Sequence, residues 1–186
     1  MSDDPAVLIG GRVRAARRDR GIALGALAAR AGVGKGSLSE IENGGRNPTL
    51  STLYALARAL DVPLSTLLAE RAGTHVTSPG IGARLLDTEH RADGATIETF
   101  RLHLDAGAEH FSDGHGRGVV EQLLITTGRA SVGPVRRQVE VGEGELAEWE
   151  ARGRHVYRAL GGDPVEAVLV IRWTRAARPV DGTMAP

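Results

Sequence analysis

The period of the hydrophobic residues changes once along this chain of 186 residues, from about 3.6 residues to 2. Before residues 71–80, apolar residues recur at helical spacing in short segments, the first three of which end at glycines. After them, apolar and polar residues alternate, as in "TIETFRLHL" at residues 96–104, which is typical of a half-buried strand. Because one pattern cannot serve both structures, the sequence predicts an all-α domain followed by an all-β domain.

The domain boundaries follow from the same patterns. We expect five short helices in residues 1–70, marked by apolar stripes at Ile9, Val13 and Ala16; Leu24, Leu27 and Ala28; Leu38 and Ile41; Leu53, Leu56, Ala57 and Leu60; and Leu64, Leu67 and Leu68. Residues 71–80 are rich in Gly, Ser and Thr and predict a linker, and residues 177–186 a tail. Residues 81–176 predict a barrel or sandwich, with strands at 96–104, 121–132, 145–149, 155–160 and 165–173.

The composition excludes several classes of protein. No apolar run approaches the roughly 20 residues of a membrane-spanning helix, and the first residues are acidic where a secretory signal is basic, so we expect a cytoplasmic protein with no membrane partner. The absence of cysteine excludes disulfides and thiolate catalysis, and a metal would need His, Asp or Glu. Residues 1–72 hold ten Lys and Arg against seven Asp and Glu, and residues 73–186 hold 13 against 16, so the helical half suits a polyanion better.

The segment "ALGALAARAGVGKGSLSEIENGGRNPTLSTLYALARAL", residues 23–60, places two short helices around a tight turn. It resembles the Xre/Cro-like helix-turn-helix family, over about Ile9 to Leu68. The matching residues are Arg17, Gly21, Leu27, Ala28, Gly32, Val33, Leu38, Ser39, Ile41, Glu42, Gly44, Pro48, Leu53 and Leu60. The resemblance implies a homodimer that binds an operator in double-stranded DNA, with the second helix of each module in the major groove.

The resemblance also implies which residues contact DNA. They are Lys35, Gly36, Ser37, Ser39, Glu40, Asn43, Arg46 and Asn47. Lys35 can donate to guanine and Glu40 can accept from cytosine, whereas Arg46, after the helix, suits a phosphate contact that fixes the register. Arg17 and Glu42 match a structural ion pair of the family. In the alternative interpretation, the helices form a bundle that only mediates dimerisation or protein docking.

The segment "GAEHFSDGHGRGVVEQLLITTG", residues 107–128, resembles the first motif of the cupin family. Gly107, His115, Glu121 and Gly128 match that motif, and the second motif is echoed at Gly144 and His155. This resemblance covers about residues 80–174 and implies an all-β cupin barrel, a double-stranded β-helix. The fold class implied for the whole chain is therefore multidomain α plus β, with a five-helix helix-turn-helix domain before the barrel.

The cupin resemblance implies a candidate site. His115, Glu121 and His155 would bring two imidazoles and a carboxylate together, and Asp113 stands where the family usually has its first histidine. The sequence by itself fixes no cofactor, but these four residues suit a divalent ion of Fe, Mn, Ni or Zn. In the other interpretation, His115 and Glu121 line a cavity or bond to each other. We expect the pocket for a small-molecule effector at Phe111, His115, Glu121, Trp149 and His155.

The function that we expect is that of a transcriptional regulator whose barrel senses a small molecule, and not that of an enzyme. No serine triad with an oxyanion hole and no phosphate-binding loop is recognisable. Two alternatives stay open. One is a metal-dependent cupin oxygenase or isomerase that carries a DNA-binding domain, and the other is an antitoxin-like DNA-binding partner subunit whose barrel serves only for protein contact.

Overall fold

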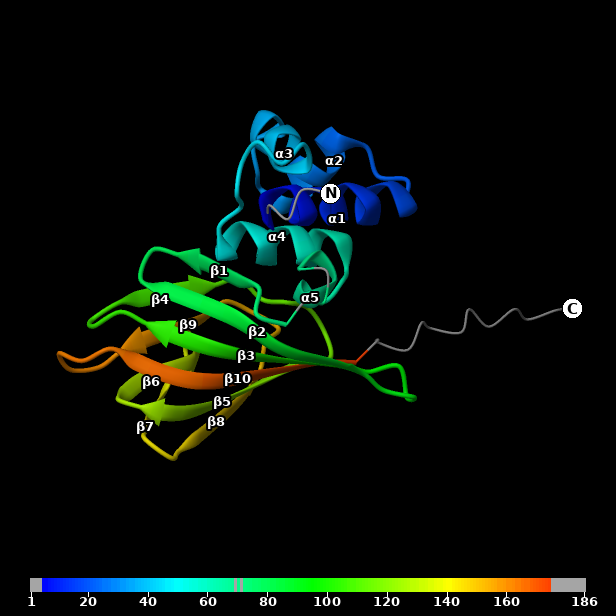
Figure 1. Cartoon of the computed structure of the whole chain (residues 1–186). Helices are drawn as coiled ribbons and strands as arrows, with labels where there is room; N and C mark the ends of the chain where they lie inside the picture. The colour runs from blue at the N-terminus through cyan, green and yellow to red at the C-terminus, as the bar shows by residue number, and fades with distance from the viewer. Residues whose placement is uncertain (1–4, 69, 71, 175–186) are drawn as a thin grey trace, which may run out of the picture.

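The computed structural model describes residues 5–68, 70 and 72–174, which form a helical unit stacked on a β unit (Figure 1). The helices are α1 (Pro5–Asp19), α2 (Leu24–Ala31), α3 (Lys35–Glu42), α4 (Leu50–Leu60) and α5 (Leu64–Leu67). The strands are β1 (His75–Ser78), β2 (Ile81–His90), β3 (Thr96–Leu104), β4 (Glu109–Ser112), β5 (Val119–Thr127), β6 (Arg129–Pro134), β7 (Val139–Gly142), β8 (Leu146–Glu150), β9 (His155–Ala159) and β10 (Val165–Trp173). The predicted order of domains is confirmed, and the expected tail at residues 177–186 lies outside the described residues.

The five helices begin and end where local chemistry allows. Gly32 ends α2 in the left-handed conformation, with φ of 66°, and the side chain of Thr49 accepts a hydrogen bond from the Thr52 amide at the start of α4. Gly10 lets α1 lie directly on the end of α3, since a Cβ atom there would lie 2.0 Å from the Ile41 carbonyl oxygen. Among the described residues, no helix has the length and apolar character needed to cross a membrane.

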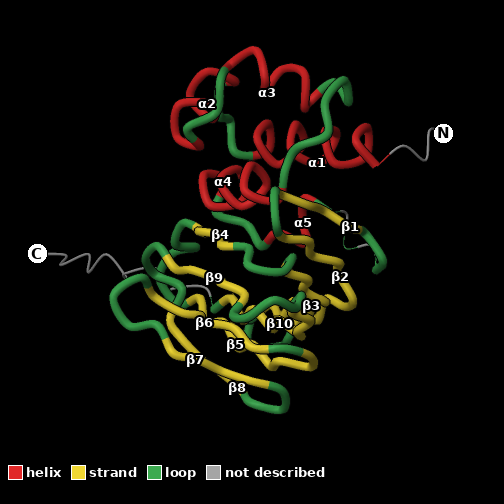
Figure 2. The backbone as a smooth tube through the Cα atoms, turned by 90° about the vertical axis from the view of Figure 1, so that its left-hand side faces the viewer, coloured by secondary structure: helices red, strands yellow, loops and turns green. Residues whose placement is uncertain are grey.

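The strands form two antiparallel sheets that face each other (Figure 2). One sheet has the order β1-β2-β3-β10-β5-β8 and the other the order β4-β9-β6-β7. Along β5, Val119, Glu121, Leu123 and Ile125 are buried, and the residues between them are less covered, as expected for strands with one face in a barrel interior. The predicted cupin barrel is confirmed.

Two details of the predicted strands need correction. The segment 71–80, expected to be a linker, contains β1, which pairs with β2 and extends the larger sheet. The run 121–132, expected to be one strand, divides at Gly128 into β5 and β6, which belong to different sheets. Gly128 has φ of 85°, and a Cβ atom there would lie 2.8 Å from the Pro164 carbonyl oxygen, so this turn needs glycine.

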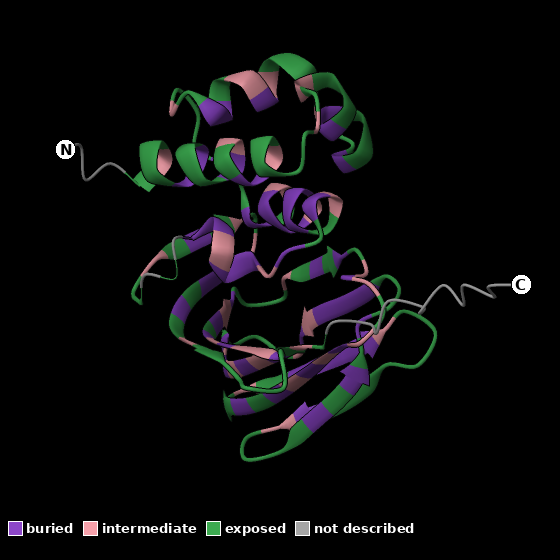
Figure 3. Cartoon of the chain, turned by 90° about the vertical axis from the view of Figure 1, so that its right-hand side faces the viewer, coloured by how far each residue is buried: buried purple, intermediate pink, exposed green. Residues whose placement is uncertain are grey.

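Helix α4 lies between helices α1–α3 and the barrel, and most of its residues are buried (Figure 3). Its stripe of Leu53, Leu56 and Leu60 belongs to the same continuous apolar core as the barrel interior. The amide and hydroxyl of Ser51 bond to the Ser78 hydroxyl of β1, at 3.1 and 3.0 Å. The helical domain is therefore packed against the barrel and is not joined to it by a flexible linker alone.

A buried carboxylate reinforces this docking at α5. Glu98 on β3 is fully buried, and it accepts hydrogen bonds of 2.5 Å from the Ser65 amide and from Trp173 Nε1. Burial raises the pKa of Glu98, although both hydrogen bonds oppose that rise. Two donors from two elements thus converge on one acceptor, which fixes α5 against β3 and β10.

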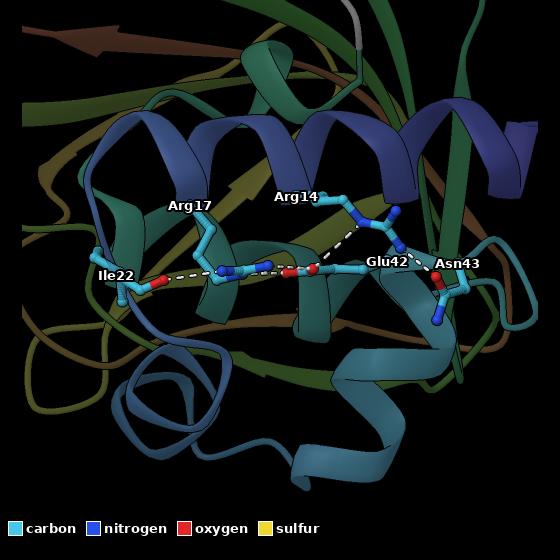
Figure 4. Close-up of polar contacts among 5 residues, drawn as sticks. All are labelled: Arg14, Arg17, Ile22, Glu42 and Asn43. Carbon is cyan, nitrogen blue, oxygen red and sulfur yellow. Dashed lines mark hydrogen bonds and ion pairs between the residues drawn. The ribbon is translucent and has the colours of Figure 1, made fainter.

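The helical domain has its own internal ion pair, as the sequence predicts. Arg17 of α1 donates from Nε and Nη2 to the two carboxylate oxygens of Glu42 in α3, at 2.6 and 2.8 Å, and from Nη1 to the Ile22 carbonyl (Figure 4). The Glu42 side chain is only 3% exposed and that of Arg17 12%. A bidentate ion pair with so little exposure fixes α3 against α1.

We expect Glu42→Gln to lower the free energy of unfolding of the helical domain by about 2 kcal/mol, because it leaves the Arg17 guanidinium without its charged partner in a covered position. The matched control is Glu40→Gln, whose parent side chain is 61% exposed and should contribute less than about 0.5 kcal/mol. Urea unfolding followed by circular dichroism measures both. Equal losses in the two variants would contradict the role of the Arg17–Glu42 pair.

Candidate functional site

Helix α3 presents a reading face like that of a helix-turn-helix. Leu38 and Ile41 are buried, with exposed fractions of 0% and 2%, and they hold the helix on the domain core. Lys35, Gly36 and Glu40 are exposed, and Ser37 and Ser39 are half-buried. The residues that follow the helix, Asn43, Arg46 and Asn47, are exposed as well. No described part of the chain covers this face, so it is free to enter a DNA groove.

Three of the predicted DNA contacts already interact with one another. Arg46 Nη1 donates to Ser37 Oγ at 3.3 Å and lies 3.6 Å from the carboxylate of Glu40. Arg14 of α1 donates to the Asn43 side-chain oxygen and lies 3.6 Å from Glu42 (Figure 4). Arg14 therefore orders the end of the reading helix, a role that the sequence does not reveal.

The barrel interior brings His115, Glu121 and His155 together. Glu121 Oε1 lies 2.7 Å from His115 Nε2, and Glu121 Oε2 lies 3.4 Å from His155 Nε2. The three candidate ligand atoms all lie within 4.8 Å of one another. The side chains are 2%, 0% and 0% exposed. Three polar side chains that the sequence places up to 40 positions apart thus share one buried point.

The backbone explains why they meet. Glu121 points inward from β5, opposite Trp149 in the register with β8, and His155 begins β9. His115 lies in the loop between β4 and β5, where its amide donates to the Ala151 carbonyl at 2.7 Å. The preceding Gly114 allows this approach, because a Cβ atom there would lie 2.2 Å from the Arg152 carbonyl oxygen. This contact directs the His115 ring toward Glu121.

Neighbouring groups orient two of the three side chains. His155 Nδ1 lies 3.1 Å from the Gly153 carbonyl oxygen, which can only accept, so Nδ1 carries a proton. In the neutral ring Nε2 then bears the lone pair that faces Glu121. The Tyr157 hydroxyl donates to Glu121 Oε2 at 2.5 Å. These contacts leave Glu121 Oε1 and His155 Nε2 directed at the centre of the cluster.

The charges in the cluster depend on each other. Burial by itself raises the pKa of Glu121, but the interactions with His155 and His115 outweigh it and hold this pKa well below its usual range. Burial likewise lowers the pKa of His155, and the charge of Glu121 reverses that effect and leaves it raised. Glu121 is therefore ionised inside the barrel, as a carboxylate ligand must be.

These residues fit a divalent metal ion. His115 Nε2, Glu121 Oε1 and His155 Nε2 are buried and have no hydrogen-bond partner among the described residues. The three ligand atoms lie within 4.8 Å of one another, so a single ion could contact all of them. Two imidazole nitrogens and one carboxylate oxygen are a donor set typical of Fe, Mn, Ni and Zn.

Two predicted site residues lie outside this cluster. The Asp113 side chain is 61% exposed and pairs with Arg58 of α4 at 3.5 Å, so it does not join the three ligand candidates. Phe111 is 38% exposed on the outer side of β4, under the guanidinium of Arg154, whose carbon lies 4.5 Å from the ring centroid. The structure thus brings together His115, Glu121 and His155 of the predicted metal set, with Trp149 beside them.

The interior also contains residues that the sequence reasoning missed. His110 lies on β4 and is 8% exposed, and its pKa is lowered, mainly by burial and further by the charge of His155. Alternation along residues 109–112 places His110 and Ser112 on the face opposite Phe111, but it does not show which of the two faces is buried. The same alternation groups Tyr157 with His155. No local signal predicts Tyr54, which reaches the site from α4.

A cleft opens beside the cluster between β6, β7 and β8. Its volume is about 400 Å³, and its lining comprises Val132, Gly133, Pro134, Arg137, Val139, Glu148, Trp149 and Glu150. Trp149 is 7% exposed, its indole lies 5.9 Å from the His155 ring between centroids, and its Nε1 is buried with no partner among the described residues. Trp149 therefore links the cleft to the cluster.

Comparisons with known proteins agree with this architecture. Residues 13–67 match the family model HTH_3, described as helix-turn-helix. The chain is 29% identical over 163 residues to the HTH-type transcriptional regulator SutR of Escherichia coli (strain K12), which covers 86% of this chain and 92% of that protein. It is 35% identical over 106 residues to the HTH-type transcriptional regulator SinR of Bacillus licheniformis, over 53% of this chain and 90% of that protein.

A solved structure has the same fold over nearly the whole chain. It is an HTH_3 family transcriptional regulator from Vibrio cholerae, with a TM-score of 0.79 and 24% identity, and the match covers 92% of this chain and 98% of that one. Its helical and β parts are thus arranged as they are here. Together with the reading face of α3 and the strand order of the barrel, the matches show that the chain belongs to the Xre-like HTH_3 family of DNA-binding transcriptional regulators and carries a cupin domain.

Proposed function

We propose that this protein is a cytoplasmic regulator that binds a specific operator as a homodimer and responds to a small-molecule effector bound in its barrel, and that it is not an enzyme. The observation that carries the effector part is the buried cluster of His115, Glu121 and His155, with three polar atoms that have no hydrogen-bond partner in the described part of the chain. An unpaired buried polar atom is costly, so such a group of atoms is expected to meet a ligand.

The proposed effector site combines the cluster with the cleft next to it. His115, Glu121 and His155 would hold a divalent ion. Such an ion would supply Lewis acidity and open positions for an oxygen or nitrogen atom of the effector. Trp149 Nε1 would donate a hydrogen bond to an acceptor on the same molecule. An effector of this site is therefore a small, polar molecule with hydrogen-bond acceptors.

The proposed DNA contacts are Lys35, Gly36, Ser37, Ser39 and Glu40 on the reading face and Asn43, Arg46 and Asn47 beyond it. Their exposure supports this assignment. A single short reading helix contacts few base pairs, so specific binding calls for two copies on neighbouring half-sites. An apolar pair on the outer face of the larger sheet, Leu124 and Leu146 in register across β5 and β8, supports a dimer contact through the barrel.

Replacing Lys35 by Ala should change operator selectivity, by about 1–3 kcal/mol at one base pair, because Lys35 would donate to a base edge.

Replacing Arg46 by Ala should weaken binding to all sequences and reduce the slope of its salt dependence by about 1, because Arg46 would contact phosphate. Selection of binding sites from random DNA, followed by titrations at several salt concentrations, distinguishes the two effects. Arg136→Ala, on the barrel, is the matched control. Selectivity unchanged in the Lys35 variant would refute its reading role.

The ion part of the proposal predicts close to one divalent transition metal per chain when the protein is purified without chelators. Glu121→Gln should lose most of this metal, because it removes the only carboxylate of the cluster. The control Glu143→Gln, at an exposed position of the turn between β7 and β8, should retain it. Elemental analysis gives both ratios. A wild-type protein that holds no metal, even after dialysis against Zn²⁺ or Mn²⁺, would rule out the ion and leave the cluster as the lining of a polar cavity.

A further inference from the structure

The barrel site is partly built by the DNA-binding domain. Tyr54 belongs to α4, inside the segment that matches the helix-turn-helix model, and its ring stacks on the ring of His115. The ring centroids are 4.5 Å apart and the ring planes differ by 24°. Tyr54 is 8% exposed, and the stacked ring covers the side of the cluster that faces the helices.

His115 depends on this stack more than the other two residues of the cluster do on their neighbours. Glu121 and His155 project from strands, and each accepts or donates a hydrogen bond that fixes its orientation. His115 lies in a loop, and its Nε2 has no hydrogen-bond partner among the described residues. Its ring touches the edge of His155 at 5.2 Å and lies 6.1 Å from Trp173. The flat contact with Tyr54 is therefore the closest ring contact that sets its orientation.

Two polar contacts between the domains lie on either side of this stack along α4, in addition to the buried Ser65–Glu98 contact at α5. Arg58, one helical turn after Tyr54, pairs with Asp113 in the loop that carries His115. Ser51, about one turn before Tyr54, bonds to Ser78 of β1. These polar contacts lie at exposed positions, where each stabilises the docked arrangement only modestly. A change in the position of the His115 ring would therefore act directly, through the Tyr54 ring, on the packing of α4 against the barrel.

We propose that Tyr54 is a positioning residue of the His115–Glu121–His155 site, and that through this stack the occupancy of the site controls how firmly the DNA-binding domain is held on the barrel. The inference rests on the proposed function, because it requires the site to be occupied. Coupling between sites is reciprocal, so a domain held in the docked position strengthens binding at the site to the same degree that binding strengthens docking.

The first test is calorimetric titration of metal-free full-length protein with Zn²⁺ alone. Tyr54→Leu removes the ring and should weaken Zn²⁺ binding about 10- to 100-fold, the range for lost orienting contacts of a metal ligand. Tyr54→Phe keeps the ring and should bind within a few-fold of the wild type. Arg58→Gln, which breaks a contact between the domains without touching the cluster, should also bind like the wild type. Circular dichroism confirms that each variant is folded.

Three results would overturn the proposal. Wild-type affinity in a folded Tyr54→Leu variant would show that the stack does not position His115. Equal weakening in Arg58→Gln would assign the effect to the domain interface in general. A wild type that does not bind Zn²⁺ would remove the ion site of the proposed function, and the coupling with it, whereas the first two results leave that site intact.

A second measurement needs no variant of Tyr54, and it decides the matter if Tyr54→Leu does not fold. Hydrogen exchange of the wild-type protein should slow in residues 50–60 when Zn²⁺ is added. A His115 ring fixed by the ion would stabilise its stack with Tyr54 and so hold α4 more firmly on the barrel. His115→Ala should show no such change. If Zn²⁺ binds the wild type and protects only barrel strands while the exchange of α4 is unaltered, the coupling is refuted.

Discussion

The packing of α4 between the helices α1 and α2 and the barrel is the contact on which the other features of this molecule depend. The apolar stripe of α4 completes the core of the helical domain, and Tyr54 on the same helix covers the polar cluster of the barrel. The helix therefore belongs to both domains at once. Because interiors are close-packed, a shift at the cluster cannot be absorbed locally without moving α4 or opening a cavity. This gives the two domains a physical reason to respond to each other.

The electrostatics of the cluster agree with a site that attracts a cation. Glu121 is fully buried and ionised, and the groups around it are two imidazoles and one phenol hydroxyl. A metal ion bound by the neutral imidazoles would itself supply the positive charge that neutralises the carboxylate, with any imidazolium proton released to solvent, so the site suits the ion in electrostatic terms as well as in geometry. An antitoxin-like subunit with a barrel used only for protein contact does not account for this cluster. The names of the relatives, which are transcriptional regulators, weigh against an enzyme.

Much of the fold could be predicted from the sequence, because hydrophobic period reports directly on secondary structure. The five helices were predictable from their apolar stripes, and the strand at residues 96–104 from strict alternation. His115, Glu121 and His155 were predictable from a family resemblance, and they meet in the barrel. Phe111 and Asp113 lie outside the cluster because β4 directs His110 and Ser112 into the barrel instead. The sequence of so short a strand does not determine which of its two faces is buried. Tyr54 could not be predicted, because its role arises only from the docking of one domain on the other.

The central claim is that the barrel site and the reading helix are coupled, and the operator affinity of the full-length protein tests it most directly. The measurement compares metal-free and Zn²⁺-loaded protein on an operator fragment obtained from genome-wide binding, at one fixed salt concentration. The account predicts that the two affinities differ by about 5- to 150-fold, the usual range of coupling between two sites, and that the difference disappears in Glu121→Gln. Equal operator affinities in the two forms, with Zn²⁺ shown to be bound, would contradict it.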